Sequence, residues 1–121
     1  MVVEFEITPI GKVRMTQRDK WKQRPAVVRY YAFKDELVLK ANLLRFHLPD
    51  EIEIEFHIPM PPSWSKKRQV EMLGQPHRHK PDADNMAKAV MDCLRQDDSG
   101  IWNIAIRKYW AQTGRIIITT A

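Results

Sequence analysis

The segment Glu51-Ile-Glu-Ile-Glu-Phe-His-Ile58 constrains the fold more than any other part of the chain. Its even-numbered positions are hydrophobic and its odd-numbered positions are charged or polar, which is the two-residue period of a half-buried β-strand. Pro59 follows, and a proline has no N–H group to donate to a neighbouring strand. We therefore predict a strand that ends near Pro59 and has one face on a hydrophobic core.

The segments before and after this strand predict another strand and two helices. Residues 2–9 alternate between hydrophobic and polar side chains, which indicates a first strand. Residues 34–47 are rich in leucine and contain neither glycine nor proline, so they predict a largely buried helix. Residues 82–95 predict a second helix.

The C-terminal residues predict two further strands. Residues 101–110 are strand-like, residues 116–118 are three consecutive isoleucines, and the turn-forming pair Thr113-Gly114 lies between them. This pattern favours a hairpin. The chain is thus predicted to be an α/β protein with one small domain over residues 1–121, in the order β-α-β-α-β-β, with two helices on a mixed sheet of about four strands.

The composition excludes several classes of protein. Hydrophobic residues make up 44% of the 121 residues and charged residues 29%, which argues against disorder. No apolar run approaches the roughly 20 residues that span a bilayer, and the acidic start with Glu4 and Glu6 does not resemble a secretory signal. Cys93 is the only cysteine, so an internal disulfide and a thiolate zinc site are excluded, and we expect a reducing cytoplasm.

Positive charge is concentrated in two segments of a chain whose net charge is +5. Residues 11–32 carry a local charge of +6 and residues 59–80 a local charge of +4, and both contain turn-forming glycine or proline. Either segment alone could be a solvated loop, but two of them, with aromatic residues between the cations, favour nucleic-acid binding. The candidate phosphate-binding residues are Lys12, Arg14, Arg18, Lys20, Lys22, Arg24, Lys66, Lys67, Arg68, Arg78 and Lys80.

The densest chemical signal is the run of carboxylates in the second predicted helix and just after it. At 100° per residue, Asp84, Asn85, Lys88 and Asp92 lie on one polar face of that helix. Helix capping by Asp82 or Asp84, together with an i, i+4 pair between Asp84 and Lys88, would explain part of this pattern without any catalytic role.

Capping needs one carboxylate, whereas this region also contains Asp92, Asp97 and Asp98. Clustered carboxylates repel one another unless a cation intervenes, and oxygen ligands suit Mg²⁺ or Mn²⁺. The acidic cluster follows directly on a basic segment, which is the arrangement that a metal-dependent nuclease needs. The alternative is a non-catalytic DNA- or RNA-binding module that uses the same two basic segments.

These residues resemble the RusA-type endodeoxyribonucleases, the Holliday junction resolvases found in phages and prophages. The resemblance is carried by the motif Lys80-Pro-Asp-Ala-Asp-Asn85, by Lys88, by Asp92 with Leu94, and by Asp97-Asp-Ser-Gly-Ile101. The proline-rich stretch that follows the strand at residues 51–58 also agrees with the family.

The resemblance implies a role for each motif residue. Asp82 and Asp84 would bind Mg²⁺ or Mn²⁺, Asp98 would complete the acidic triad, and Lys88 would be the catalytic lysine. The link from the helix to the two consecutive aspartates is short here, so Asp97 is an alternative to Asp98 as the third carboxylate. Asn85, Asp92 and Asp97 would otherwise be supporting residues.

The resemblance also implies a substrate, an assembly and a location. The substrate would be branched DNA, above all four-way junctions, and the protein would act as a homodimer, because a four-way junction is two-fold symmetric and needs two symmetric nicks. The location would be a bacterial cytoplasm or that of a phage-infected host.

Overall fold

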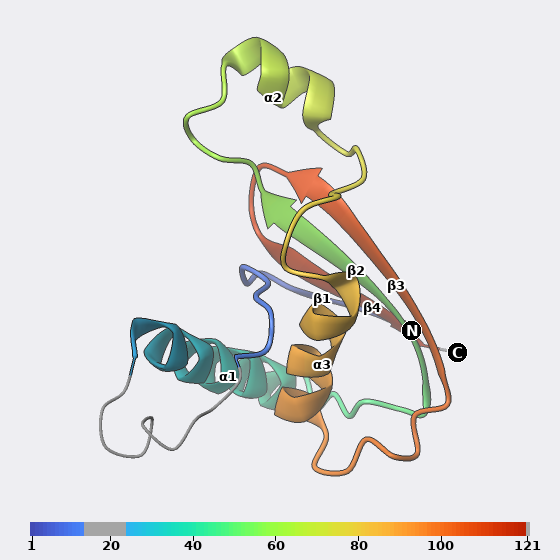
Figure 1. Ribbon diagram of the computed structural model, residues 1–121. Coiled ribbons are helices and arrows are strands. Elements are labelled where there is room, and N and C mark those ends of the chain that lie inside the picture. The colour runs from blue at the N-terminus through green and yellow to red at the C-terminus, as the bar shows by residue number, and fades with distance from the viewer. Residues whose placement is uncertain (14–23, 121) are drawn as a thin grey trace.

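The computed structural model describes residues 1–13 and 24–120 of the chain. Within these residues, three helices and one mixed sheet of four strands form an α/β fold (Figure 1). The elements are β1 (Val2–Phe5), α1 (Pro25–Leu43), β2 (Glu51–Pro59), α2 (Lys66–Met72), α3 (Ala83–Leu94), β3 (Asn103–Ala111) and β4 (Arg115–Thr120). No helix in this part of the chain is long and apolar enough to cross a membrane.

The strand at residues 51–59 is confirmed, and as β2 it is the centre of the sheet. The strand order is β1-β4-β2-β3, with β2 parallel to β3 and antiparallel to β4. The predicted C-terminal hairpin is wrong, because β2 lies between β3 and β4. The central position aligns Ile54 with Ile106 on one side and Ile118 on the other, so the most regular amphipathic strand gains hydrophobic neighbours on both edges.

The hydrophobic core lies between the sheet and the two long helices. Phe33 and Leu37 of α1, and Met86 and Val90 of α3, are buried against the even-numbered side chains of β2. The odd-numbered side chains of β2 lie on the opposite face of the sheet, where the Glu53–Arg107 ion pair is about half exposed. The predicted burial of one face of β2 is therefore confirmed.

Two helices differ from the prediction. Helix α1 begins at Pro25 instead of residue 34, because proline is tolerated in the first turn, where its missing N–H group has no helical partner in any case. The part of the first basic segment from residue 25 to 32 is therefore helical. Helix α2 was not predicted at all; it begins where the Ser65 side chain accepts a hydrogen bond from the Arg68 N–H.

Candidate active site

Asp82 and Asp84 lie together at the N-terminal end of α3. Asp82 occupies the position just before the first helical residue, yet its side chain makes no capping hydrogen bond, and Asp84 lies in the first turn. Both side chains are exposed. Capping therefore does not explain Asp82, and the pair presents anionic oxygens at a helix end whose dipole stabilises negative charge.

Lys108 of β3 holds the backbone that leads into this pair of carboxylates. Its Nζ donates hydrogen bonds to the carbonyl oxygens of His79 and Pro81, each at 2.7 Å, and the Lys80–Pro81 peptide bond between them is cis. Partial burial lowers the pKa of Lys108, while the charge of Asp82 acts in the opposite direction. The sheet thereby positions the start of α3.

Lys108 is a site residue that the sequence analysis missed. It shares a face of β3 with Ile104, Ile106 and Trp110, and its register partner on β2 is the buried Phe56. A lysine in the hydrophobic register of a strand is the signal that could have identified it, because burying a cation needs compensating acceptors.

The segment after β1 packs against the first turn of α3. The Asn85 side-chain amide donates to the carbonyl oxygen of Lys12, and the Lys12 N–H donates to the carbonyl oxygen of Asn85, both at 3.2 Å. Gly11 fits closely here, since a Cβ at that position would lie 2.6 Å from Asn85 Nδ2 and 2.9 Å from Pro81 Cβ. Asn85 thus joins the start of α3 to the segment that follows β1.

Lys12 and Asp92 form an ion pair at 2.5 Å, and each side chain is about one-third exposed. Asp92, a predicted supporting residue, therefore faces a cation of this chain, and Lys12, a predicted phosphate-binding residue, has an internal partner. Lys88 is exposed between Asp84 and Asp92. The ion pairs of the described residues do not include one between Asp84 and Lys88, so the simple salt-bridge interpretation of Lys88 is not supported.

Asp97 and Asp98 lie at the other end of α3, which is visible in Figure 1 as the loop between α3 and β3. The helix has 12 residues, so its two ends are about 18 Å apart. The Asp97 carboxylate accepts a hydrogen bond from the Ser99 N–H at 3.0 Å, which lowers the pKa of Asp97. Asp98 is exposed. One described chain therefore does not assemble the acidic triad of Asp82, Asp84 and Asp98 that the resemblance implies.

The metal-binding capacity of a single chain follows from this separation. Among residues 1–13 and 24–120, no three histidine, cysteine, aspartate or glutamate side chains lie close enough to hold a metal ion. Asp82 and Asp84 provide two exposed oxygen ligands of the kind that Mg²⁺ prefers. The pair fits part of a Mg²⁺ ligand shell, and the rest would have to come from water, the substrate or another subunit.

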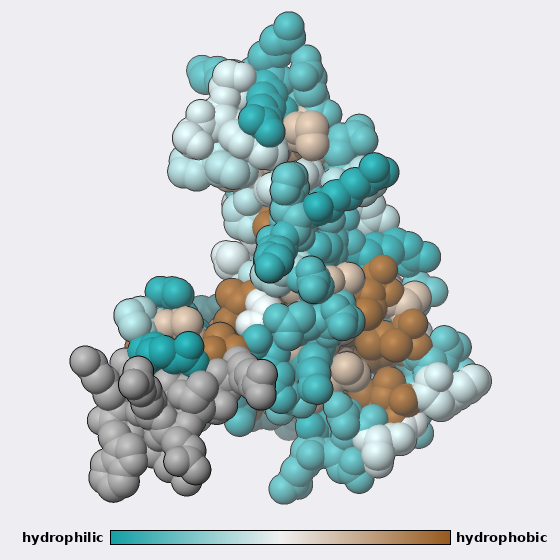
Figure 2. Space-filling view, viewed as in Figure 1, coloured by the Kyte–Doolittle hydropathy of each residue, from teal (hydrophilic) through white to brown (hydrophobic). Residues whose placement is uncertain are grey.

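Five cations of the second basic segment lie close to the acidic pair along the chain. All five are exposed: Lys66, Lys67, Arg68, Arg78 and Lys80. Figure 2 shows hydrophilic side chains over α2 and down the face formed by α3. From the first segment, Arg24 is exposed, while Arg14, Arg18, Lys20 and Lys22 lie outside the described residues.

Two histidines precede the motif. His77 is 5% exposed, its ring centroid is 4.3 Å from that of Trp110, and its Nδ1 has no hydrogen-bond partner. Burial lowers the pKa of His77, and the nearby cation of Lys108 adds to this effect. His77 is therefore buried in the structure, whereas His79 is exposed.

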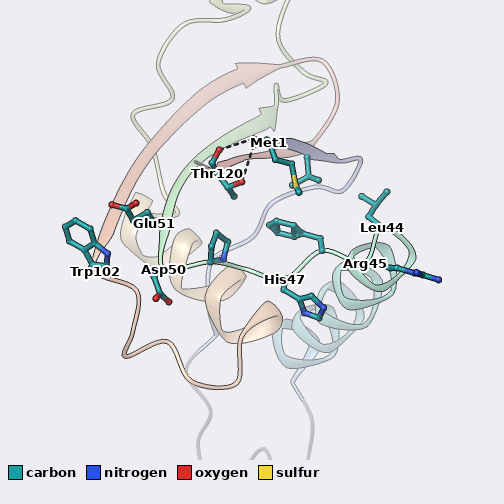
Figure 3. A pocket seen from close by; sticks show the side chains of 11 residues that line it. Met1, Leu44, Arg45, His47, Asp50, Glu51, Trp102 and Thr120 are labelled. Atoms are coloured by element: carbon teal, nitrogen blue, oxygen red, sulfur yellow. Dashed lines mark hydrogen bonds between the residues drawn. The ribbon is translucent and has the colours of Figure 1, made fainter.

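A surface pocket of about 520 Å³ lies at the opposite end of β2 (Figure 3). Leu44, His47, Asp50 and Trp102 are among its lining residues. Asp50 forms an ion pair with Arg95, which lies just beyond the C-terminal end of α3, at an N–O distance of 2.7 Å. The pocket is therefore separate from the acidic pair.

The model of the family described as endodeoxyribonuclease RusA matches residues 6–120. No curated protein matches the chain.

Proposed function

The chain belongs to the RusA endodeoxyribonuclease family, and from this premise we propose that it is a Mg²⁺-dependent nuclease that resolves four-way DNA junctions by paired phosphodiester hydrolysis. The observation that carries the proposal is the exposed, uncapped pair Asp82 and Asp84 at the N-terminal end of α3. The basic segment from Lys66 to Lys80 precedes this pair directly, so phosphates and a hard cation would be held side by side.

Each residue of the α3 face has a distinct chemical task in this proposal. Asp82 and Asp84 would hold Mg²⁺ or Mn²⁺, which when bound neutralises charge on the scissile phosphate and activates water. Lys88 lies one turn further along α3 and is exposed, so its ammonium can stabilise the charge that develops on the phosphate or the leaving oxygen. Lys108 holds the backbone before Asp82 in place.

We further propose that the active form is a homodimer in which Asp98 of the partner subunit completes the ligand set. Two observations support this arrangement: Asp98 lies at the far end of α3 from Asp82, and it is exposed. A dimer of this kind matches the two-fold symmetry of a four-way junction and provides two equivalent sites.

The basic test is cleavage of a synthetic four-way junction with and without Mg²⁺. Asp82→Asn and Asp84→Asn should abolish cleavage, while junction binding in chelator persists or tightens because negative charge has been removed near the phosphates. Asp35→Asn, at an exposed aspartate of α1, is the matched control and should cleave normally. If the wild type binds the junction but does not cleave it in the presence of Mg²⁺, a non-catalytic DNA- or RNA-binding module becomes the better interpretation.

The shared site can be tested by mixing two inactive variants. If Asp98 acts on the other subunit, a mixed dimer of Asp82→Asn and Asp98→Asn subunits contains one doubly altered site and one intact site, so nicking at one position should return. If Asp98 acts within its own chain, both sites of the mixed dimer stay altered and the mixture remains inactive.

A further inference from the structure

Helix α2 stands away from the rest of the molecule (Figure 1). None of its seven residues is buried, and only Gln69 and Met72 are half-buried. A helix of this length is not stable in isolation. Its conformation must therefore be maintained by the segments on either side of it.

The segment before α2 is held by a stack of rings and a cation. The ring centroids of Trp64 and Trp110 are 4.8 Å apart, and the Arg68 guanidinium lies 4.0 Å from the centroid of Trp64. Trp110 is a buried residue of β3. The stack therefore ties the start of α2 to the sheet.

The segment after α2 is bound to the edge of β3. The Gly74 N–H donates to the Trp110 carbonyl, the Trp110 N–H donates to the Gln75 carbonyl, both at 2.9 Å, and the His77 N–H donates to the Lys108 carbonyl at 3.0 Å. The segments before and after α2 thus both contact Trp110. We call residues 62–77 the α2 arm; it is braced at its base and exposed at its tip.

The α2 arm is also joined to the candidate active site. Lys108, whose carbonyl oxygen binds His77, uses its side chain to hold the carbonyl oxygens of His79 and Pro81 immediately before Asp82. One strand therefore positions both the base of the arm and the acidic pair. A DNA phosphate bound at Asp82 would therefore lie near the base of the arm.

The surface of the arm combines exposed hydrophobic side chains with cations. Val70 is 77% exposed and Leu73 is 49% exposed, and their i, i+3 spacing places them on the same side of the helix. The three cations Lys66, Lys67 and Arg68 outnumber the single acid Glu71. Duplex DNA offers such hydrophobic residues no partner, whereas an unstacked base step offers an apolar gap flanked by phosphates.

We propose that the α2 arm enters the branch point of the DNA, where Val70 and Leu73 insert between unstacked bases and the arm's cations hold the adjoining phosphates. The inference deepens the proposed function and rests on it. Proteins that kink DNA use apolar wedges in this way, at a cost in unstacking energy. At a branch point that cost is lower, because the bases there already lack one stacking neighbour. The arm would then favour branched DNA over linear duplex.

The test uses the full-length protein in chelator and a synthetic four-way junction that carries 2-aminopurine at its centre. Binding of the wild type should raise the fluorescence, because this base brightens when it unstacks. Val70→Ser/Leu73→Ser should lose most of this rise and weaken junction binding about tenfold or more, with linear duplex binding unchanged. Leu39→Ser, at a 59% exposed leucine of α1, is the matched control and should behave as wild type.

Several results would overturn the inference. The first is a full fluorescence rise with the double variant, and the second is an equal loss of junction and duplex binding. The third is a change of oligomeric state, in which the wild type sediments as a dimer and the double variant as a monomer. The last result would assign the apolar pair to the partner subunit. The fluorescence test does not depend on cleavage, which is measured in the separate assay with Mg²⁺. A protein that shows the arm-dependent rise but fails to cut junctions in that assay would reject the proposed function and retain the role of the arm.

Discussion

Lys108 Nζ donates a hydrogen bond to the carbonyl oxygen of Pro81 at 2.7 Å, across 27 residues of sequence. A second hydrogen bond from the same nitrogen reaches the His79 carbonyl oxygen, also at 2.7 Å. These contacts fix the backbone just before Asp82 to the sheet. The carboxylate pair consequently takes its position from β3 as well as from its own helix.

Replacement of this lysine should impair catalysis more than DNA binding. Lys108→Met leaves two carbonyl groups without their donor, so we expect the free energy of unfolding to fall by about 1–3 kcal/mol. The displaced start of α3 should lower the cleavage rate about tenfold to a hundredfold on saturating four-way junction. The free energy of unfolding and the cleavage rate are both measured below the melting temperature of the Lys108→Met variant.

A neighbouring residue of β3 provides the control. Arg107→Met removes a cation from the opposite face of the strand, where the ion pair with Glu53 has an N–O distance of 3.8 Å and about half of each side chain is exposed. Such pairs contribute little to stability. Equal losses of activity in the Arg107 and Lys108 variants would show that Lys108 has no positioning role.

Lys88→Ala should reduce cleavage without affecting stability. The side chain is exposed on α3 and forms no ion pair with Asp84, so its removal should leave the melting temperature almost unchanged. If it stabilises charge in the transition state, the turnover rate should fall by at least about a hundredfold while junction affinity is kept. Lys88→Arg keeps the charge in a different position and should restore activity only in part. Wild-type turnover in Lys88→Ala would refute the catalytic assignment.

Asp97 and Asp98 should differ sharply on replacement. The Asp97 carboxylate is engaged by the Ser99 N–H within its own loop, so Asp97→Asn should retain most of the cleavage activity. Asp98→Asn removes an exposed carboxylate that we assign to the metal site, and cleavage should be lost. Single-turnover rates on a four-way junction measure the difference; the reverse order would make Asp97 the third carboxylate.

His77 should make the protein less stable in acid. Its folded-state pKa is lowered, chiefly by burial, whereas in the unfolded chain a histidine takes up a proton near pH 6.5. Above that pH both states are neutral at this position. As the pH falls below it, the unfolded state binds a proton that the folded state resists, so the free energy of unfolding decreases.

Melting curves from about pH 7.5 to about pH 5.5 test this dependence. His77→Gln should lose less of its melting temperature across the range than the wild type does, whatever its starting value. His79→Gln, at the exposed histidine two residues away, should keep the wild-type slope. Identical slopes for all three proteins would mean that His77 does not carry the acid sensitivity.

Several features of this protein depend on local sequence pattern and could be predicted from it. The period of two residues in Glu51–Pro59 identified β2 and its buried face, and the helical period after Pro81 placed Asp84, Lys88 and Asp92 on one face of α3. The motif around Asp82 also identified the family, because its residue types and spacing are contained within one short segment. Neighbouring residues are sufficient for all of these inferences.

Contacts between segments far apart in the sequence could be identified only in the folded chain. Strand pairing depends on residues far apart in the sequence. The sequence therefore predicted two strands in the C-terminal region, but not that they lie on either side of β2. The contact between Lys108 and Pro81 depends on the position of β3 beside the segment before α3. The α2 arm could be recognised only in the structure, where its helix buries none of its residues. The separation of Asp98 from Asp82 follows from the length of α3, because residues at opposite ends of a helix of 12 residues stay about 18 Å apart even though they are near one another in the sequence.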